Sequence, residues 1–422
     1  MKLTKKVITH QIKKLYYRES MGWLRTLYRG SLLGTPHKWL PNLFGLVILP
    51  CLYIIKPFKF VKLCPIQYDR IGHLAGSTDL FLRRLQLEKT PKKAILYLGI
   101  SGKPANQQLL KMFKRKLPII QSTHACSMVG SYALKKSIFY EPIPKIAGKF
   151  YEFNDTEPNL HFTEPEEDEG KKLLNKMGID DNSWFICFHS RDSVYLSSQW
   201  NKLYDSSRDW GYHDFRDCNI KNYLEAAKYI ASLGGFAVRV GYGVAEKLPD
   251  LNNARIIDYA SYHRTDFGDI YLPAKCKFFL GNPAGISLIS TIFHVPVIWG
   301  NNIPFDQTPH RKGDLYIPKK TWSTKKERFL TFGEILESEV AHYGFGTQYA
   351  EAGLEVVENT PEEILDLAKE MNERLDGNFK YTEEDEELQK RFRSLFQPHH
   401  HSYGSPARIG AKFLRQNKEL LK

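Results

Sequence analysis

The chain has 422 residues, more than a single domain usually holds, which predicts two domains of roughly 150 to 200 residues each. Hydrophobic residues make up 42%, aromatic residues 13% and charged residues 25%, so the composition is globular and excludes a disordered chain. The formal net charge is +13, and Lys and Arg crowd residues 1–63. Such an excess suits a membrane surface or nucleic acid. No recognisable nucleic-acid motif accompanies it, which favours a membrane and no nucleic acid.

An apolar run at residues 43–55, flanked by aromatic and basic residues, interrupts this basic region. It is too short for a comfortable membrane span, and Pro41, Gly45 and Pro50 are expected to break a continuous helix. The flanks favour a segment that lies in the membrane interface within an N-terminal region of residues 1–63. The alternative is a buried core segment of the first domain.

The six cysteines are scattered, without a CxxC pair or a Cys/His cluster. This pattern indicates neither a disulfide framework nor a zinc site, and it favours a reducing compartment. With the basic, apolar N-terminal region, it predicts a cytoplasmic protein held at the inner face of the cytoplasmic membrane.

The next part of the sequence alternates between strand and helix patterns. Strands are expected at 61–68 and 93–98, helices at 78–84 and 106–114, and another apolar run at 117–120. This predicts an α/β domain over residues 64–160. A stretch rich in proline and acidic residues, 140–169, disfavours a compact element and marks the domain boundary.

The second half repeats a strand, turn and helix pattern. Strands are expected at 184–189, 236–240 and 277–280, and helices at 166–177, 220–233 and 408–421. The pattern predicts a parallel sheet covered by helices over residues 161–400, and a C-terminal helix within 401–422 that returns to the first domain. Ligands of such sheets bind at the carboxyl ends of the strands.

Residues 278–301 read as a buried strand, a turn of small residues, a helix start and a second buried strand. The helix is expected to begin near Gly285–Ser287, where free backbone N–H groups would hold a phosphate. Candidate ligands in this turn are Asn282, Gly285, Ile286 and Ser287. An ordinary structural turn between strand and helix is the alternative.

Two further strand ends carry cationic side chains. Arg191, next to His189, can present a planar fork to phosphate oxygens, or it forms an ion pair with Asp192. Arg239 stands beside Gly241, whose missing side chain permits a close backbone approach. Arg239 would meet an anionic leaving group, or it would be buried against Asp258 or Asp269.

Two polar segments complete the candidate site. Residues 208–217 include His213, Asp214 and Arg216 among several aromatic residues, so part of this stretch is expected to be ordered against a ligand or the other domain. Residues 266–272 include Asp269, but they lack the clustered ligands of a metal site. Capping or pairing with an arginine is the expectation for that carboxylate.

Several motifs together resemble a bacterial glycosyltransferase family of surface-carbohydrate gene clusters: FHSRDSVYL (188–196), YHDFRD (212–217), VRVGYG (238–243), DFGDIYLPAKCKFFLGNPAGIS (266–287) and ENTPEEILDLAKEM (358–371). The likeness spans roughly residues 65–420. More distantly, the motifs are similar to fucosyltransferases and heptosyltransferases of the GT-B architecture. This resemblance implies two facing Rossmann-like domains, a nucleotide-diphosphate sugar held by the C-terminal domain, and a glycan or lipid-linked acceptor.

The resemblance also implies a hexosyl- or deoxyhexosyl-transferase chemistry without cofactor or metal. Arg191, Arg239 and the helix start would stabilise the departing diphosphate. The turn 69–73 resembles the family's N-terminal motif, in which Arg70 and Gly72 would approach the ligands. His73 and Asp79 are the candidates for the general base. A non-catalytic nucleotide- or carbohydrate-binding protein at the membrane is the alternative.

Overall fold

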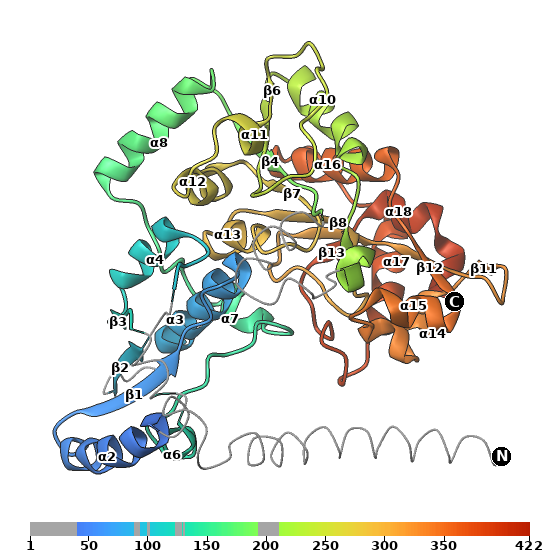
Figure 1. Ribbon diagram of the computed structural model, residues 1–422. Coiled ribbons are helices and arrows are strands. Elements are labelled where there is room, and N and C mark those ends of the chain that lie inside the picture. Colours follow the sequence, from blue (N-terminus) through green and yellow to red (C-terminus); the bar gives the residue numbers. More distant parts are fainter. Residues whose placement is uncertain (1–39, 88–92, 99–101, 123–128, 130, 193–210) are drawn as a thin grey trace, which may run out of the picture. The chain divides into compact units, whose positions relative to one another are not determined.

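The computed structural model describes residues 40–87, 93–98, 102–122, 129, 131–192 and 211–422 (Figure 1). The chain forms two compact units. Unit 1 comprises residues 1–65, 92–101 and 120–142, and unit 2 comprises residues 66–91, 102–119 and 143–422. These units cut across the ranges expected from the sequence, because the segment that begins with the turn 69–73 packs with the C-terminal half.

Unit 1 combines a short parallel sheet with an apolar helix. Strand β1 (Phe60–Pro65) pairs in parallel with β2 (Lys93–Leu98), and β3 (Ile119–Ile120) follows β2 in the sheet. Helix α2 (Leu40–Ile55) packs against α6 (Tyr132–Lys135). Its small core contains Leu63, Val129 and Leu134, against which residues of α2 pack.

The expectation that prolines and glycine interrupt the apolar run is wrong. Residues 40–55 form one continuous α-helix that includes Pro50. A side chain at Gly45 would collide with Ser131, so the glycine permits the close approach of α2 to the segment that begins α6. Packing therefore outweighs the local preference against these residues. No helix in the described part of the chain is long and apolar enough to cross a membrane.

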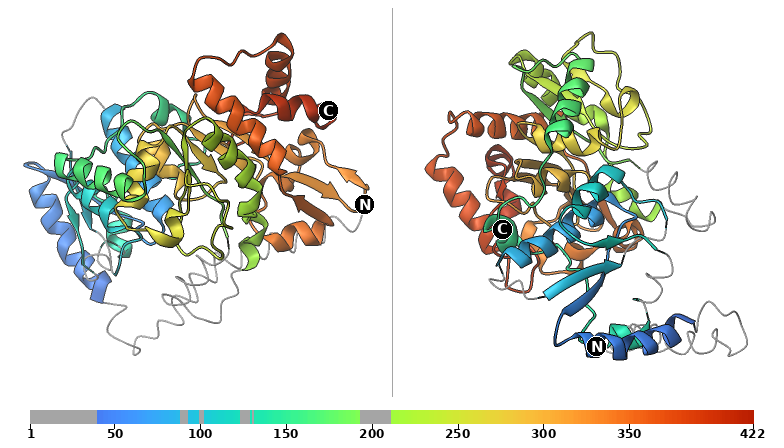
Figure 2. Two further views of the ribbon diagram at one scale, coloured as in Figure 1. Left: turned by 90° about the horizontal axis from the view of Figure 1, so that it is seen from above. Right: turned by 90° about the vertical axis from the view of Figure 1, so that its left-hand side faces the viewer.

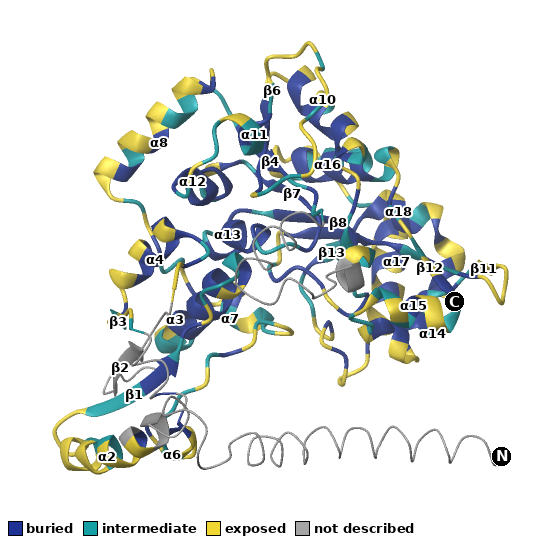
Figure 3. Ribbon diagram, viewed as in Figure 1, coloured by how far each residue is buried: buried dark blue, intermediate teal, exposed yellow. Residues whose placement is uncertain are grey.

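Unit 2 is built around a seven-stranded sheet whose neighbouring strands all run parallel. In spatial order the strands are β13 (Arg408–Ile409), β9 (Leu315–Pro318), β8 (Val297–Asn302), β7 (Phe279–Gly281), β4 (Phe185–Phe188), β5 (Phe236–Arg239) and β6 (Ile256–Ile257). All residues of β4 and β5 are buried, and all except Arg239 are apolar (Figure 3). The predicted parallel α/β sheet is confirmed; the arrangement of two facing domains stays a prediction.

The strand order places a topological switch point beside β4. From β4 the chain first adds β5 and β6 on one side, and then returns to add β7, β8 and β9 on the other. In open parallel sheets ligands bind in the crevice at such a switch point, outside the carboxyl ends of the two strands. The carboxyl ends of β4 and β7 are therefore the place to look for a site.

Two groups of helices cover this sheet (Figures 1 and 2). Helices α10 and α16 pack together against β5, β8 and β9, whereas α12 and α13 pack together and α13 contacts β7 and β8. The helices over the sheet and at its C-terminal side are η3 (Ile220–Tyr223), α10 (Leu224–Ser232), α11 (Tyr259–Tyr262), α12 (Gly268–Lys275), α13 (Ser287–Ile292), α16 (Pro361–Leu375), α17 (Glu383–Ser394), α18 (Ala411–Gln416) and η5 (Lys418–Leu421).

The rest of unit 2 consists of shorter elements. They are the π-helical turn η1 (His73–Ser77), α3 (Thr78–Leu87), α4 (Gln107–Lys114), α7 (Phe150–Asn154), α8 (Glu164–Lys176), η2 (Gly211–Arg216), α14 (Phe332–Leu336), η4 (Glu339–His342) and α15 (Gly346–Ala352). A small antiparallel sheet adds β11 (Arg328–Phe329), β10 (Lys320–Ser323) and β12 (Leu354–Val357).

Two local expectations need correction. The Pro-rich stretch 140–169, whose composition disfavours a compact element, contains α7. Helix α8 agrees with the helix expected at 166–177, and the polar segment 266–272 forms most of α12. The expected helix 408–421 begins instead with β13, which pairs with β9. Helix α18 then packs against α16 and α17 of unit 2, whereas the sequence suggested a return to the first domain.

Candidate anion-binding site

The side-chain amide of Asn282 connects the loops that follow β4 and β7 at the switch point. Asn282, which is fully buried after β7, accepts a hydrogen bond from the backbone N–H of Arg191 at 3.0 Å. Its side-chain nitrogen donates to the carbonyl of Arg216 at 3.1 Å. Asn282 thus joins the ends of β4 and β7 to the segment that follows η2, which brings together three regions proposed from the sequence.

Cationic side chains gather around this junction. Arg191 Nε lies 3.3 Å from Asp217 Oδ1, and Arg216 Nη2 donates to the carbonyl of Pro283 at 3.1 Å. The buried Nε of Arg216 has no hydrogen-bond partner within the described residues. Lys319, only 5% exposed, donates through Nζ to the carbonyl of Asp217 at 2.6 Å. Arg191 and Lys319 therefore both contact Asp217, and Arg216 is its neighbour in the sequence.

The pKa values of these cationic groups are lowered by their surroundings. Burial, together with the nearby charges of Arg191 and Arg70, lowers the pKa of Arg216 to about 9. Burial also lowers the pKa of Arg191 and of Lys319. Arg216 therefore remains charged at pH 7, close to other cations and partly removed from water. An anion bound between these cations would reduce their mutual repulsion.

Asp217 responds to the same surroundings. Burial raises its pKa to about 7, although Arg191 opposes that rise. Its carboxyl group is therefore partly protonated near neutral pH and neutralises less than one full positive charge. This leaves Arg191 and Arg216 available to interact with a ligand anion.

The turn 69–73 reaches the loop after β7 through two glycines. A side chain at Gly72 would come within 2.7 Å of Gly285 Cα, and one at Gly285 within 2.7 Å of the Gly72 nitrogen. The two backbones are thus in direct contact, which brings Arg70 close enough to lower the pKa of both site arginines. Both glycines are required by packing.

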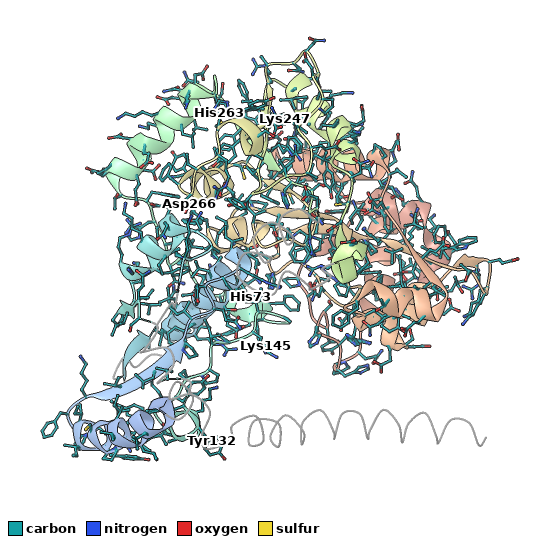
Figure 4. The ribbon with its side chains drawn as sticks, in the orientation of Figure 1. His73, Tyr132, Lys145, Lys247, His263 and Asp266 are labelled. Atoms are coloured by element: carbon teal, nitrogen blue, oxygen red, sulfur yellow. The ribbon has the colours of Figure 1, made fainter. Side chains whose placement is uncertain are left out.

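His73 begins η1 directly after this contact, and Figure 4 labels it there. Its side chain is exposed. Partial burial lowers its pKa from 6.5, and the charge of Arg70 adds to that effect. The imidazole is therefore neutral at pH 7, which is the protonation state a general base requires.

In the turn before α13, where the sequence suggested a phosphate site, the Ser287 hydroxyl already has hydrogen-bond partners within the protein. The Ser287 hydroxyl donates to the carbonyl of Ala284 at 2.8 Å and accepts from Trp299 Nε1 at 3.2 Å. Ser287 is fully buried and Ile286 nearly so. Since Gly285 is covered on one side by Gly72, these residues build the turn, and the positive charge comes from the side chains of other residues.

His189 is held at the end of β4 with one nitrogen engaged. Its Nδ1 lies 2.9 Å from the carbonyl oxygen of Val240, so this nitrogen carries the proton. Burial lowers the pKa of His189 to about 4, and the ring is neutral. Gly241 has φ +149°, and a side chain there would come within 3.1 Å of His189 Nδ1. His189 can contribute Nε2 as a neutral group.

Arg239 lies at the end of β5, but its guanidinium is engaged elsewhere. It is 2% exposed and donates through Nη1 to the carbonyl of Glu246 at 2.6 Å. The same nitrogen lies 3.5 Å from Asp258 Oδ2, which also accepts from the backbone N–H of Leu248 at 3.0 Å. The buried pairing left open by the sequence is the arrangement found, and it fixes the loop after β5.

Asp79 is also enclosed by partners. It is completely buried, with Oδ2 at 2.5 Å from Arg83 Nε and Oδ1 accepting from Asn159 at 2.9 Å. Arg83 in turn donates to the carbonyl of Ile292 at 2.9 Å, at the end of α13. These contacts give Asp79 a structural part in anchoring α3, and the structure lends no support to its use as a base.

Asp269 has partners of its own, whereas Asp214 lies near enough to Asp217 to help raise the pKa of that carboxyl group. Asp269 is buried in α12, pairs with Arg264 at 2.7 Å, and accepts from Tyr259 at 3.2 Å; burial raises its pKa to about 7. Asp214 is exposed. The side chain of His213 lies outside the described ones.

Lys319 and Asp217 are the site residues that sequence reasoning missed. Asp217 stood at the end of a quoted motif without an assigned role. Lys319 directly follows β9, so the rule that searches the carboxyl ends of parallel strands would have found it. No group of three or more His, Cys, Asp or Glu side chains suited to a metal ion occurs among the residues that the structure describes.

The chain is similar to solved structures of bacterial glycosyltransferases. ADP-heptose LPS heptosyltransferase II of E. coli is 14% identical, with a TM-score of 0.41 over 75% of this chain and 99% of that one. The family 9 glycosyl transferase of Veillonella parvula is 10% identical, with a TM-score of 0.34 over 57% and 79%. E. coli heptosyltransferase WaaC with ADP is 9% identical, with a TM-score of 0.31 over 69% and 99%.

All three likenesses are distant in sequence and in structure. The sequence matches no protein-family model and no curated protein.

Proposed function

We propose that the chain is a glycosyltransferase that moves a sugar from a nucleotide-diphosphate donor to a glycan or lipid-linked acceptor in bacterial surface polysaccharide biosynthesis. The observation that carries this proposal is the crowding of Arg191, Arg216 and Lys319 at the switch point between β4 and β7. The resemblance of the sequence motifs supports the choice of reaction and pathway.

The cationic cluster suits the charge that develops in such a reaction. Breaking the bond between sugar and phosphate leaves a diphosphate anion, and preorganised cations stabilise it as it forms. Arg191 and Arg216 present guanidinium groups, which match phosphate oxygens, and Arg70 adds charge from the turn 69–73. These groups provide an alternative to a divalent cation, so the proposed reaction is independent of metal.

His73 is the proposed general base. Its neutral imidazole is exposed at the start of η1, next to the contact of Gly72 with Gly285. In an inverting reaction it would take the proton from the acceptor hydroxyl as that oxygen attacks the sugar. Asp79 is not retained in this role, because both carboxylate oxygens are engaged in a buried site.

The donor class is testable by ligand-dependent stabilisation. The full chain is heated with ADP-, GDP-, UDP-, CMP- and dTDP-sugars in EDTA, and ADP-heptose is included because a solved structure similar to this chain, TibC, is a complex with it. A selective rise in melting temperature is expected, since a ligand of the folded state stabilises it. Arg216→Ala should lose that rise, whereas Arg391→Ala, at an exposed position of α17, should keep it.

Release of nucleoside diphosphate in the presence of an extracted glycolipid fraction then tests turnover. Donor-dependent release that requires the acceptor supports a transferase. Selective binding without turnover for any acceptor contradicts the enzyme proposal and favours a nucleotide- or carbohydrate-binding protein.

A further inference from the structure

The charge of the chain is concentrated in unit 1. Its sequence ranges hold 16 Lys and Arg but only two acidic residues, Glu19 and Glu141. The ranges of unit 2 hold 44 Lys and Arg against 45 Asp and Glu, and are nearly neutral. The whole net charge of +13 therefore belongs to the smaller unit, which is an electrostatic footprint for an anionic partner.

Helix α2 of this unit exposes an apolar stripe. Its members recur at i, i+3, i+4, i+7 and i+11, which places them on one face of a helix. Leu43, Leu46, Val47, Pro50 and Ile54 form this stripe, and the four aliphatic side chains among them are between 51% and 71% exposed. Phe58, just beyond the helix, is 91% exposed. Yellow ribbon along α2 in Figure 3 marks this exposure.

The opposite face of α2 is already used within unit 1. Ile48, Leu49 and Leu52 pack on the core of that unit, and the Tyr53 ring meets Phe139 edge-on at 4.9 Å. Helix α2 is therefore packed on the core of unit 1 through one face. The exposed apolar stripe is its other face.

We propose that unit 1 docks on an anionic lipid bilayer, with α2 parallel to the membrane surface and its apolar stripe between headgroups and acyl chains. The helix is about 24 Å long at 1.5 Å per residue, and the polar end carries the exposed Lys56 and Lys59. Aliphatic groups inserted beside lysines that meet acidic headgroups are the pattern of interfacial helices.

The observations favour lipid over other occupants of this surface. Nucleic acid would satisfy the charge but would leave the aliphatic stripe in water. A second copy of the chain would bring two strongly positive units together, which opposes association. This inference goes beyond the proposed transferase activity and does not depend on it.

Flotation of the full chain with vesicles tests the proposal. Vesicles of phosphatidylcholine containing 30% phosphatidylglycerol should carry the protein upward, and pure phosphatidylcholine should carry much less. Leu46→Ser with Val47→Ser and Ile54→Ser should lower the partition coefficient at least tenfold. The control, Leu233→Ser with Leu375→Ser and Tyr403→Ser, changes apolar side chains of unit 2 that are 43% to 53% exposed and should bind as the unaltered chain does.

Cys51, one turn after Val47 at the border of the stripe, provides a second readout. It is the exposed cysteine among the described ones, since Cys64, Cys187, Cys218 and Cys276 are buried. In a Cys126→Ser background, an environment-sensitive dye on Cys51 should shift to the blue when anionic vesicles are added. A dye on Leu375→Cys, in a chain that also carries Cys51→Ser, should not shift.

Each opposite result overturns the proposal. Flotation of the stripe variant at the level of the unaltered chain would show that the apolar face takes no part. Absence of flotation with anionic vesicles, or tighter binding to a 20-base-pair DNA duplex that the stripe variant retains, would show that the charge serves another partner. Donor-induced stabilisation of the stripe variant should remain, which separates this proposal from the transferase.

Discussion

At the scale of residues, the arginines differ in whether their guanidinium groups are hydrogen-bonded within the fold. Arg239 donates to the loop after β5, whereas the buried Nε of Arg216 has no hydrogen-bond partner among the described residues. Both stand in motifs, VRVGYG (238–243) and YHDFRD (212–217), that made them candidates from the sequence. Their difference arises from contacts with distant residues, such as Asp258 and Pro283, that no local pattern specifies.

Arg239→Ala is expected to affect stability more than donor binding. Removing the guanidinium leaves the buried Asp258 carboxylate with fewer partners, and breaking a buried pair commonly costs about 3 to 5 kcal/mol. Urea denaturation should show this loss. Asp258→Ala combined with Arg239→Ala should be less destabilised than the sum of the single changes; full additivity would contradict the pairing.

The lowered pKa of His73 predicts a pH profile for the transfer reaction. A base must be unprotonated, and the pKa of His73 is lowered from 6.5, so kcat/KM should fall at acidic pH with a midpoint below 6.5. His73→Asn should lower kcat by about 100-fold or more, while the donor still raises the melting temperature. Retention of the acidic limb in His73→Asn would assign it to another group.

At the scale of elements, the site depends on η1 touching the loop between β7 and α13. Neither segment leaves room for a side chain at the contact, because an added Cβ on either glycine meets the backbone of the other. The contact also holds Arg70 near Arg191 and Arg216, and His73 follows it directly at the start of η1. It is therefore a structural requirement for assembling the site.

Gly285→Ala should loosen that contact. The new methyl group would come within 2.7 Å of the Gly72 nitrogen, and overpacking of this kind typically costs about 1 to 3 kcal/mol. Thermal unfolding should show the loss, together with weaker donor binding. Gly313→Ala, where nothing lies within 4 Å, is the matched control; equal stability of both variants would contradict the contact.

Elements with strong local signals were predictable from the sequence. Strand β2 has the expected bounds, and α4 begins after Asn106, whose side chain accepts from the backbone of Leu109 and caps the helix. Where the prediction failed, tertiary packing decided: α2 continues through Pro50, and residues 408–409 form a strand because β9 offers an edge. The sequence also indicated the loops after β4 and β7, but not Lys319.

At the scale of the whole molecule, charge and chemistry are divided between two units. The nearly neutral unit 2 contains the switch-point site, and unit 1 contains the positive charge and the apolar stripe of α2. A transferase that acts on lipid-linked acceptors would need both functions in one chain. The two proposals remain separable, because substitutions for each lie in different units.

The central claim is that Arg191 and Arg216 bind the diphosphate of the donor. Its most direct test is calorimetric titration of the full chain in EDTA with the nucleoside diphosphate whose sugar gives the largest thermal shift. We predict that Arg191→Ala and Arg216→Ala each weaken binding at least about tenfold, the scale of a lost charged hydrogen bond, while Arg391→Ala binds normally. Unchanged affinity in folded Arg191→Ala and Arg216→Ala proteins would contradict the account.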